Sequence, residues 1–353
     1  MNSQEKKLEI FKFFEAAIDR GASDIIFTAG VPPSARLNGA VVQFDLPPLT
    51  PDDSLRLLYS VLSQDQIAQF EREWELDFSV QYRSKARFRG NAYRQKGASA
   101  FVFRLIPALI PSLDDLNLPA VLTELGMQPQ GLLLFTGPTG HGKSTSQAAL
   151  LDLINQHRRC HIVTVEDPIE YLHTSKKSII DQREVGDDTH TFAAALKHVL
   201  RQDPDVIQIG ELRDLESMSV ALTAAETGHM VLATLHTNSA VQSVDRIIDV
   251  FPPHQQNQIR TQLSFCLLAI VSQRLLPRAD GKGRIPVVEV LRNVPAVANL
   301  IREGKTQQIG TIIETHAKIG MQSLDSALKD LYRRGVITRD IALKYISTSK
   351  ALD

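Results

Sequence analysis

The sequence predicts an α/β protein with a small N-terminal α+β domain and a larger domain built on a parallel sheet. Two observations support this prediction. From about residue 119 onward, short apolar runs typical of buried strands alternate with segments of helical periodicity, which favours a parallel sheet covered by helices on both faces. Before residue 106, an opening helix is followed by strand-like segments and one further helix, which is the order expected of a small α+β domain.

The N-terminal domain is predicted over residues 1–105. Its first segment has apolar residues at helical spacing, broken by charges and stopped by Gly21, so it is an expected amphipathic helix and not a signal peptide. The elements expected after it are strands over 23–30 and 34–44, one helix over 53–73, and strands over 76–82, 86–95 and 99–106. Two prolines, Pro107 and Pro111, then mark a linker over 106–118.

The larger domain, predicted over 119–290, opens with a buried-type strand and a loop that matches G-x-x-x-x-G-K-[ST]. Glycines let several backbone N–H groups converge on phosphate oxygens, and the helix that begins here adds the positive end of its dipole. Lys143 would reach the β- and γ-phosphates of a nucleotide, and the hydroxyl of Ser144 would bind Mg²⁺. The predicted nucleotide-binding residues are Gly137, Pro138, Thr139, Gly140, His141, Gly142, Lys143, Ser144 and Thr145.

Three further predicted strands run directly into the polar residues Glu166, Glu211 and His236. Ligands of open parallel sheets lie at the carboxyl ends of the strands, so these side chains and the loop are expected to share one crevice. Taken singly, each acid fits a helix cap or a solvated turn, and the histidine fits a hydrogen-bonded loop residue. Beside a phosphate loop they match the needs of ATP hydrolysis: an acid to orient or deprotonate water, an acid to support Mg²⁺, and a polar residue to sense the γ-phosphate.

The composition argues against several classes of protein. Lys and Arg number 39 against 40 for Asp and Glu, so the formal charge is −1 and no nucleic-acid partner is expected. The two cysteines, Cys160 and Cys266, are expected to be buried reduced thiols and are too few for a four-cysteine zinc site. The longest apolar run, 265–271, is far shorter than the ~18 residues of a membrane span. We therefore expect a soluble, cytoplasmic protein.

Four sequence boxes, in order, resemble those of the hexameric secretion and type IV pilus ATPases. "GPTGHGKST" resembles the Walker A box, "TVEDPIEY" the Asp box, "LRQDPDVIQIGELRD" the atypical Walker B box and "AETGHMVLATLHTNSA" the His box. The upstream segments "SDIIFTAGVPPSARLNG" and "RFRGNAYRQ" are also similar to the family's N-terminal domain. The resemblance implies a RecA-like P-loop ATPase domain, a smaller N-terminal α+β (PAS-like) domain, and a helical C-terminal tail over 291–353.

The resemblance also assigns roles to single residues. It implies Glu166 as the catalytic base and Glu211 as the Walker B acid that supports Mg²⁺, with His229 and His236 as the His-box contacts. The cofactors that it implies are ATP and Mg²⁺.

Arginines form a second group of implied site residues. Arg89 and Arg104 resemble N-terminal-domain arginines that approach the phosphates, although exposed strand arginines in surface ion pairs are the alternative. Arg201 and Arg213, which flank the Walker B strand, are weaker candidates because they fit interface residues equally well.

Within the family, the chain resembles the pilus retraction motors most. It begins almost directly at the domain before the motor, lacks a four-cysteine module, and carries "NLIREGK". His141 stands where the family usually has Ser or another small residue, and Ala298 stands where retraction motors tend to have Arg. The second departure leaves open an accessory retraction motor or an extension or secretion motor.

The partners follow from the same resemblance. It implies a homohexamer at the cytoplasmic face of the inner membrane, an inner-membrane pilus platform protein, and a paralogous pilus motor as a further partner. A nucleic-acid translocase is disfavoured by the neutral charge, and a non-hydrolysing nucleotide-gated scaffold is disfavoured by the two acids.

Overall fold

The computed structural model describes residues 9–37, 39–83, 86–106 and 109–347, which form two compact units, Met1–Leu109 and Ile110–Asp353. The division falls inside the predicted linker over 106–118. However, Leu113 and Leu118 of that segment are buried in the core of the second unit, beside Leu122 and Leu150. The second half of the expected linker is therefore a packed part of the larger unit.

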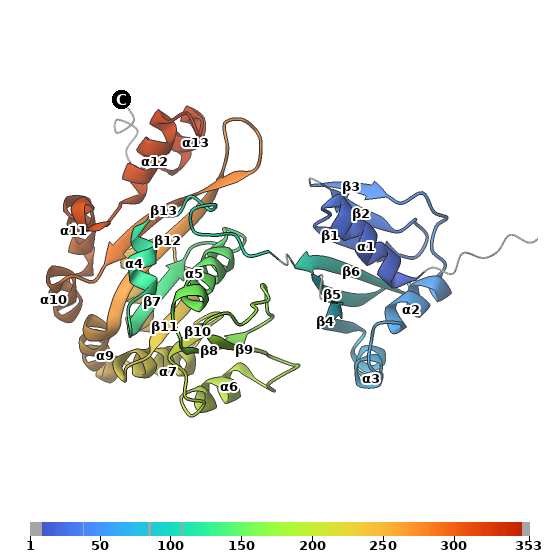
Figure 1. The fold of residues 1–353 in the computed structure, drawn as a ribbon, viewed down its shortest axis with the longest axis horizontal. Helices are drawn as coiled ribbons and strands as arrows, with labels where there is room; N and C mark the ends of the chain where they lie inside the picture. Colours follow the sequence, from blue (N-terminus) through green and yellow to red (C-terminus); the bar gives the residue numbers. More distant parts are fainter. Residues whose placement is uncertain (1–8, 38, 84–85, 107–108, 348–353) are drawn as a thin grey trace, which may run out of the picture. The chain divides into compact units, whose positions relative to one another are not determined.

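The described part of unit 1 contains a six-stranded antiparallel sheet in the order β3-β2-β1-β6-β5-β4 (Figure 1). Its strands are β1 (Asp24–Thr28), β2 (Ser34–Leu37), β3 (Ala40–Gln43), β4 (Glu75–Tyr82), β5 (Ala86–Gln95) and β6 (Ala98–Ile106). One face packs on the amphipathic helix α1 (Ile10–Arg20), whose end at Gly21 has the left-handed conformation that glycine favours. The strands predicted over 23–30, 76–82, 86–95 and 99–106 are confirmed, whereas the single strand expected over 34–44 is the antiparallel pair β2 and β3.

The expected single helix over 53–73 is two helices, α2 (Pro51–Tyr59) and α3 (Gln64–Glu73). The break has a local cause. The Ser63 side chain accepts from the backbone N–H of Gln66, and the Gln66 side chain accepts from the backbone N–H of Ser63, so a new helix begins there with a complete capping box. The helical spacing of the apolar residues continues across this break, which is why the pattern alone suggested one helix.

The described part of unit 2 is built on a seven-stranded sheet in the order β13-β12-β7-β11-β10-β8-β9 (Figure 1). The strands are β7 (Gly131–Thr136), β8 (His161–Glu166), β9 (Ile179–Glu184), β10 (Val206–Ile209), β11 (Met230–Leu235), β12 (Leu267–Pro277) and β13 (Arg284–Arg292). Strands β12, β7, β11, β10, β8 and β9 are mutually parallel, and β13 is antiparallel to β12. The predicted parallel sheet is confirmed.

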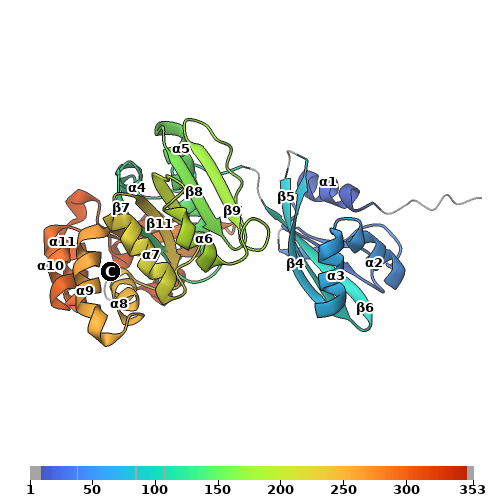
Figure 2. The ribbon, with the colours of Figure 1, turned by 90° about the horizontal axis from the view of Figure 1, so that it is seen from below.

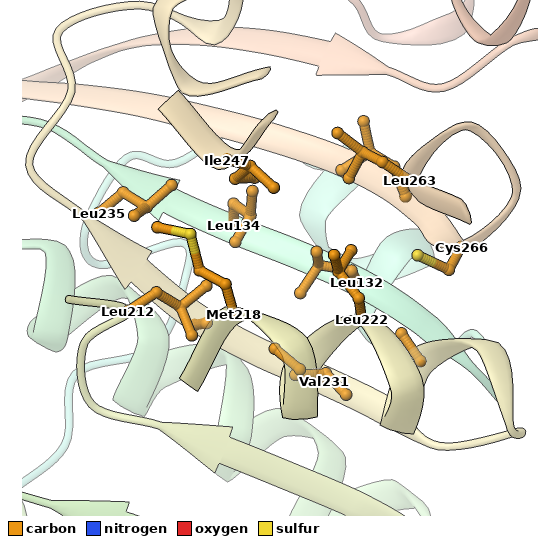
Figure 3. Packing of buried hydrophobic residues seen from close by; sticks show 14 of the residues in the cluster. Leu132, Leu134, Leu212, Met218, Leu222, Val231, Leu235, Ile247, Leu263 and Cys266 are labelled. Carbon is orange, nitrogen blue, oxygen red and sulfur yellow. The ribbon is translucent and has the colours of Figure 1, made fainter. Parts of the chain in front are cut away.

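Helices cover both faces of this sheet. One face packs on α4 (Val121–Gly126) and α5 (Lys143–His157). The opposite face packs on α6 (Phe192–Val199), α7 (Leu215–Glu226), α8 (Ala240–Asp249) and α9 (Pro253–Cys266), and Figure 2 shows this side in a turned view. In Figure 3, Leu132 and Leu134 of β7 lie among Met218 and Leu222 of α7 and Ile247 of α8. Burial of these apolar side chains stabilises the packed layers.

The chain beyond β13 is helical, as expected for the C-terminal tail. Its helices are α10 (Pro295–Glu303), α11 (Ile309–Thr315), α12 (Leu324–Arg333) and α13 (Arg339–Tyr345), with short 3₁₀ turns at Thr306–Gln308 and Ala317–Ile319. Helices α12 and α13 pack on the β12–β13 hairpin through Leu276, Ile285 and Val287.

The two cysteines differ in burial. Cys266 is buried at the end of α9, and burial raises the pKa of its thiol to about 12. Cys160 is only partly buried just before β8, where its sulfur lies 3.2 Å from the Ser178 hydroxyl, so the expectation that both thiols are buried is wrong. Within the described residues, no helix is long and apolar enough to cross a membrane.

Candidate functional site at the carboxyl ends of the parallel strands

The phosphate loop connects β7 to α5, as its motif predicted, and Lys143 is the first residue of the helix. Only 7% of Lys143 is exposed, and its Nζ donates to the carbonyl oxygens of Gly137 (2.8 Å) and Pro138 (3.1 Å). Burial lowers the pKa of Lys143, and the negative charges of Glu211 and Glu170 oppose that effect. The ammonium group is therefore held at the mouth of the loop in a desolvated position.

His236 connects the loop lysine to Glu211. Its Nδ1 lies 3.4 Å from Lys143 Nζ and 3.3 Å from Thr139 Oγ1, and its Nε2 lies 3.0 Å from Glu211 Oε1. An ammonium group can only donate, so Nδ1 is the acceptor and Nε2 carries the hydrogen that is directed at Glu211. The imidazole of His236 thus bridges the loop lysine and Glu211.

Glu211 continues this network toward the loop after β8. Its Oε2 accepts from Arg213 Nε at 2.9 Å, and Arg213 lies 3.8 Å from Asp167 Oδ2. Among the arginines predicted from the sequence, Arg213 therefore joins the site through the Walker B acid. The pKa of the Arg213 guanidinium is raised, first by its hydrogen bond to Glu211 and then by the negative charge of that carboxylate.

Glu166, the last residue of β8, is buried, with 6% of its surface exposed. Its Oε1 accepts from Thr164 Oγ1 at 2.7 Å and from Gln182 Nε2 at 3.2 Å. Burial raises the pKa of this carboxyl group to about 7, although the hydrogen bonds from Thr164 and Gln182 act in the opposite direction. Glu166 is consequently an acid that changes its charge near neutral pH.

Several contacts of the loop involve residues that the sequence patterns did not single out. Thr145 Oγ1 lies 2.9 Å from the hydroxyl of Tyr171, which ties the helix start to the chain after β8. Arg284 of β13 donates to the carbonyl of Gly140 at 3.2 Å, and the backbone N–H of Leu275 donates to His141 Nδ1 at 3.0 Å. Tyr171 lies in the Asp box, so its position in that box was a usable signal; Arg284 and Leu275 had none.

A pocket of about 220 Å³ adjoins the first turn of α5. It is lined on one side by Gly142 and Thr145 and on the other by residues of the β12–β13 hairpin, among them Arg278 and Arg284. Asn117, from the segment predicted as a linker, completes its wall.

Two candidates lie at the other end of the strands. His229 precedes β11, and its Nδ1 bonds to the carbonyl of Ala224. Because His236 follows the same strand, the six residues of β11, roughly 20 Å, separate the two histidines. Arg201 is exposed and precedes β10, whereas Arg213 follows that strand. The structure does not bring His229 and Arg201 together with the lysine and the acids of the same chain. The reason is that parallel strands gather at one edge only the residues that follow them.

Arg89 and Arg104 lie side by side in unit 1, as register partners on β5 and β6. Arg104 is 71% exposed and its Nε bonds to Asp24 at 2.9 Å, while Arg89 is 44% exposed and lies 4.0 Å from Asp77. Both are thus exposed strand arginines in ion pairs, which is the alternative that the sequence left open. Their guanidinium groups nevertheless lie on the same open face of the sheet.

The group of side chains at the carboxyl edge defines a class of protein. A phosphate loop between a strand and a helix, with a lysine, a histidine and acids delivered by neighbouring parallel strands, is the arrangement of a P-loop nucleoside triphosphatase.

Known proteins narrow this class. The family described as Type II/IV secretion system protein matches residues 112–335. The type IV pilus retraction ATPase PilT of Pseudomonas aeruginosa is 44% identical over 95% of this chain and 97% of its own length. The type IV pilus ATPase PilU of the same organism is 43% identical over 98% of this chain and 90% of its own.

Solved structures give the same result. The crystal structure of the pilus retraction motor PilT with bound ADP matches with a TM-score of 0.91 and 47% identity, covering 97% of this chain and 98% of that chain. The Legionella pneumophila ATPase DotB matches with a TM-score of 0.81 and 25% identity, covering 98% and 97%. The chain belongs to the Type II/IV secretion system protein family.

The burial of Glu166 predicts a pH-dependent cost in stability. Its pKa of about 7 lies above the ordinary 4.5, so the ionised form is less favourable in the folded protein than in the unfolded chain. Folding stability is therefore lost as pH rises from about 4.5 to about 7, by about 3 kcal/mol at roughly 1.4 kcal/mol per pKa unit. Glu166→Gln should raise the melting temperature at pH 8 and give little gain at pH 5.

Thermal unfolding at the two pH values measures this effect. The exposed Glu216 in the first turn of α7 provides a control, because Glu216→Gln should not raise the melting temperature at pH 8. Equal shifts for Glu166→Gln at pH 5 and pH 8 would contradict the assigned cause.

Proposed function

We propose that this protein is an ATP-hydrolysing motor that powers retraction of type IV pili. The observation that carries this proposal is the continuous network from the phosphate-loop lysine through His236 to Glu211 in a chain that resembles PilT over nearly its whole length. A lysine, an acid and a polar sensor around one loop are what phosphoryl transfer to water requires, because catalysis there depends on positioning and charge stabilisation.

The nucleotide is proposed to be ATP, with its phosphates on the loop over Gly137–Thr145 and its sugar and base in the pocket beside Thr145 and Arg278. The donors fit Mg²⁺, because this ion is usually bound by one or two protein oxygens together with nucleotide phosphates and water. Ser144 and Glu211 would hold it. Bound there, Mg²⁺ would neutralise phosphate charge.

Two acids divide the remaining work. Glu166 is proposed as the general base, because a base is most effective when its pKa lies near the working pH, and burial places this one at about 7. Glu211 is less buried and is already paired with His236 and Arg213, which suits an acid that supports a metal ion and reports on the γ-phosphate. His236 would transmit changes at the Lys143 ammonium to that carboxylate.

Variants of the lysine and the buried acid test this assignment. Lys143→Ala removes the positive charge that would contact the β- and γ-phosphates, so it should abolish hydrolysis in a folded protein.

Glu166→Gln should still bind Mg·ATP but hydrolyse it slower by on the order of 10²-fold or more. Binding measured by calorimetry beside single-turnover hydrolysis distinguishes the two. Near wild-type hydrolysis by Lys143→Ala would refute the proposal. Near wild-type hydrolysis by Glu166→Gln would indicate that Glu211, and not Glu166, is the general base.

The active assembly is proposed to be a homohexamer in which Arg89 and Arg104 approach the phosphates of a nucleotide bound to unit 2. Their adjacent guanidinium groups on an open sheet face support this, as does the general use of arginines from a second domain or subunit to stabilise phosphoryl transfer. Such an arrangement would couple hydrolysis to the relative motion of domains.

Arg104→Ala should therefore bind Mg·ATP like wild type and lose most of its turnover. Arg72→Ala is the matched control, because Arg72 is an equally exposed arginine of unit 1 that pairs only locally with Glu73. Steady-state hydrolysis beside nucleotide affinity is the measurement. Unchanged turnover in Arg104→Ala would indicate that Arg104 forms a surface ion pair with Asp24 and has no role in hydrolysis.

The motor is proposed to act on a platform protein at the cytoplasmic face of the inner membrane. An accessory retraction motor is the second candidate, because PilU matches this chain almost as closely as PilT does. Ala298 also favours it. This residue is half-buried on α10, where retraction motors tend to carry Arg. A secretion motor is less well supported, since the type II secretion system protein E of Aeromonas hydrophila matches only 47% of this chain.

Cells lacking the protein should remain piliated, or become more heavily so, with impaired fibre retraction. Imaging of labelled pili measures this. Loss of pili would indicate an extension or secretion motor, and normal retraction would favour the accessory candidate.

Ala298→Arg should then increase retraction without changing the ATPase rate, whereas Ala296→Arg on the same helix should not increase retraction.

A further inference from the structure

We propose that Gln273 of β12 is a positioning residue that fixes the phosphate loop in the conformation that receives phosphate. The proposal rests on the nucleotide-binding function proposed above and adds to it a residue outside the four sequence boxes. Gln273 is 2% exposed, and both atoms of its amide group are used. Its Nε2 donates to the carbonyl of His141 at 2.8 Å, and its Oε1 accepts from Ser146 Oγ at 2.7 Å.

The topology explains why this side chain is available to the loop. Strand β12 pairs with β7 only as far as Ser272, opposite Thr136, and then continues to Pro277. Where β7 ends, the phosphate loop takes its place beside β12. Gln273 is the first residue beyond the paired register, so it is the first to face the loop.

Gln273 also accounts for two of the glycines in the loop. A Cβ atom at Gly137 would collide with the backbone carbonyl oxygen of Gln273, and one at Gly142 would lie 2.9 Å from its Nε2. Both glycines have positive φ, +140° and +82°, which a side chain would further strain. The loop therefore packs against Gln273 from both ends, at distances that only glycine permits.

The hydrogen bond to His141 has a direct consequence for phosphate binding. In a planar trans peptide, the carbonyl and the following N–H point in opposite directions. Holding the His141 carbonyl toward β12 thus turns the N–H of Gly142 away from β12. Arg284 holds the Gly140 carbonyl in the same way, which turns the N–H of His141. The carbonyl oxygens of Gly140 and His141, which would repel phosphate, are thus bonded to the hairpin, and the N–H groups that follow them are left to face an anion.

The side chain must donate on one side and accept on the other, so its chemistry is narrowly specified. Gln273→Glu keeps the shape and the acceptor for Ser146 but replaces the donor to His141 with a carboxylate oxygen. Two oxygens then face each other, and the peptide between His141 and Gly142 is released or repelled. Affinity for phosphate should fall while the sheet remains paired.

The test is calorimetric titration of the full chain with Mg·ADP, which measures affinity and the binding-competent fraction separately. Gln273→Glu should raise Kd by at least tenfold with little change in stoichiometry, and Gln273→Met should do the same. Gln322→Glu is the matched control. Gln322 also donates from Nε2 to a backbone carbonyl, that of Val288 at 2.9 Å, but on the far strand of the hairpin. The Gln322→Glu variant should bind Mg·ADP with the affinity of the wild type.

A purely structural role would make Gln273→Glu resemble Gln322→Glu, with a lowered melting temperature or stoichiometry and an unchanged Kd, and would overturn the proposal. Failure of both Gln273 variants to fold would overturn it as well, because Gln273 would then be required for the fold. Wild type and Lys143→Ala are titrated alongside. If wild type fails to bind Mg·ADP, it is the proposed function that fails, whereas normal wild-type binding with normal Gln273→Glu binding rejects this inference alone.

Discussion

The parallel pairing of β7, β11, β10 and β8 is the constraint on which the site depends. Their registers align Thr136 with Leu235, and Ile209 with both Ala233 and Val165, so these strands end within two residues of each other. Each chain segment that leaves the sheet at this edge brings one polar group. The loop lysine, His236, Glu211 and Glu166 thus lie at the same edge of the sheet although they span almost a hundred positions in sequence.

The electrostatics of the site follow from how deeply each group is buried. Burial is the largest cause that lowers the pKa of Lys143 and raises that of Glu166, and in both cases charged or hydrogen-bonding neighbours oppose the shift. Lys143 is supported by two loop carbonyls and by the negative charge of Glu211. His236 lies between the lysine and the acid. The result is a desolvated lysine bonded to the loop and a buried acid with a pKa of about 7, both at the same edge of the sheet.

Much of this arrangement was predictable from sequence, because it depends on short-range signals. An apolar run that ends in a polar residue identifies both the strand and the site residue at its end, which is how Glu166, Glu211 and His236 were found. The helix break at Ser63 depended on one capping box inside a continuous helical pattern. His229 lies at the other end of β11 from His236, because the His box spans a strand whose two ends lie at opposite edges of the sheet, and its role as a His-box contact stays a prediction.

Gln273 could not be found this way. Its strand was visible in the sequence only as part of an apolar stretch, with no indication that β12 would pair beside β7 and extend past its end. The contact between residues 141 and 273 is long-range, and a buried glutamine carries no local signal of its partner. What the sequence did contain was the complementary half of the contact, the glycines at 137 and 142, whose need for space could be interpreted only after the opposing strand was in place.

The histidine at position 141, where the family usually has a small residue, contacts the part of β12 that extends past the end of β7. The N–H of Leu275 lies beyond the end of β7 and donates to His141 Nδ1. An acceptor at Nδ1 means that the imidazole is neutral and carries its hydrogen on Nε2. Burial lowers the pKa of His141, and the charges of Arg274, Arg284 and Lys143 lower it further, so protonation is disfavoured by the same surroundings that use the ring as an acceptor. The histidine therefore satisfies a backbone donor of β12 without adding positive charge to the loop. A side chain at this variable position of the motif can thus serve the attachment of the loop to the hairpin, while phosphate recognition is left to the backbone and to Lys143.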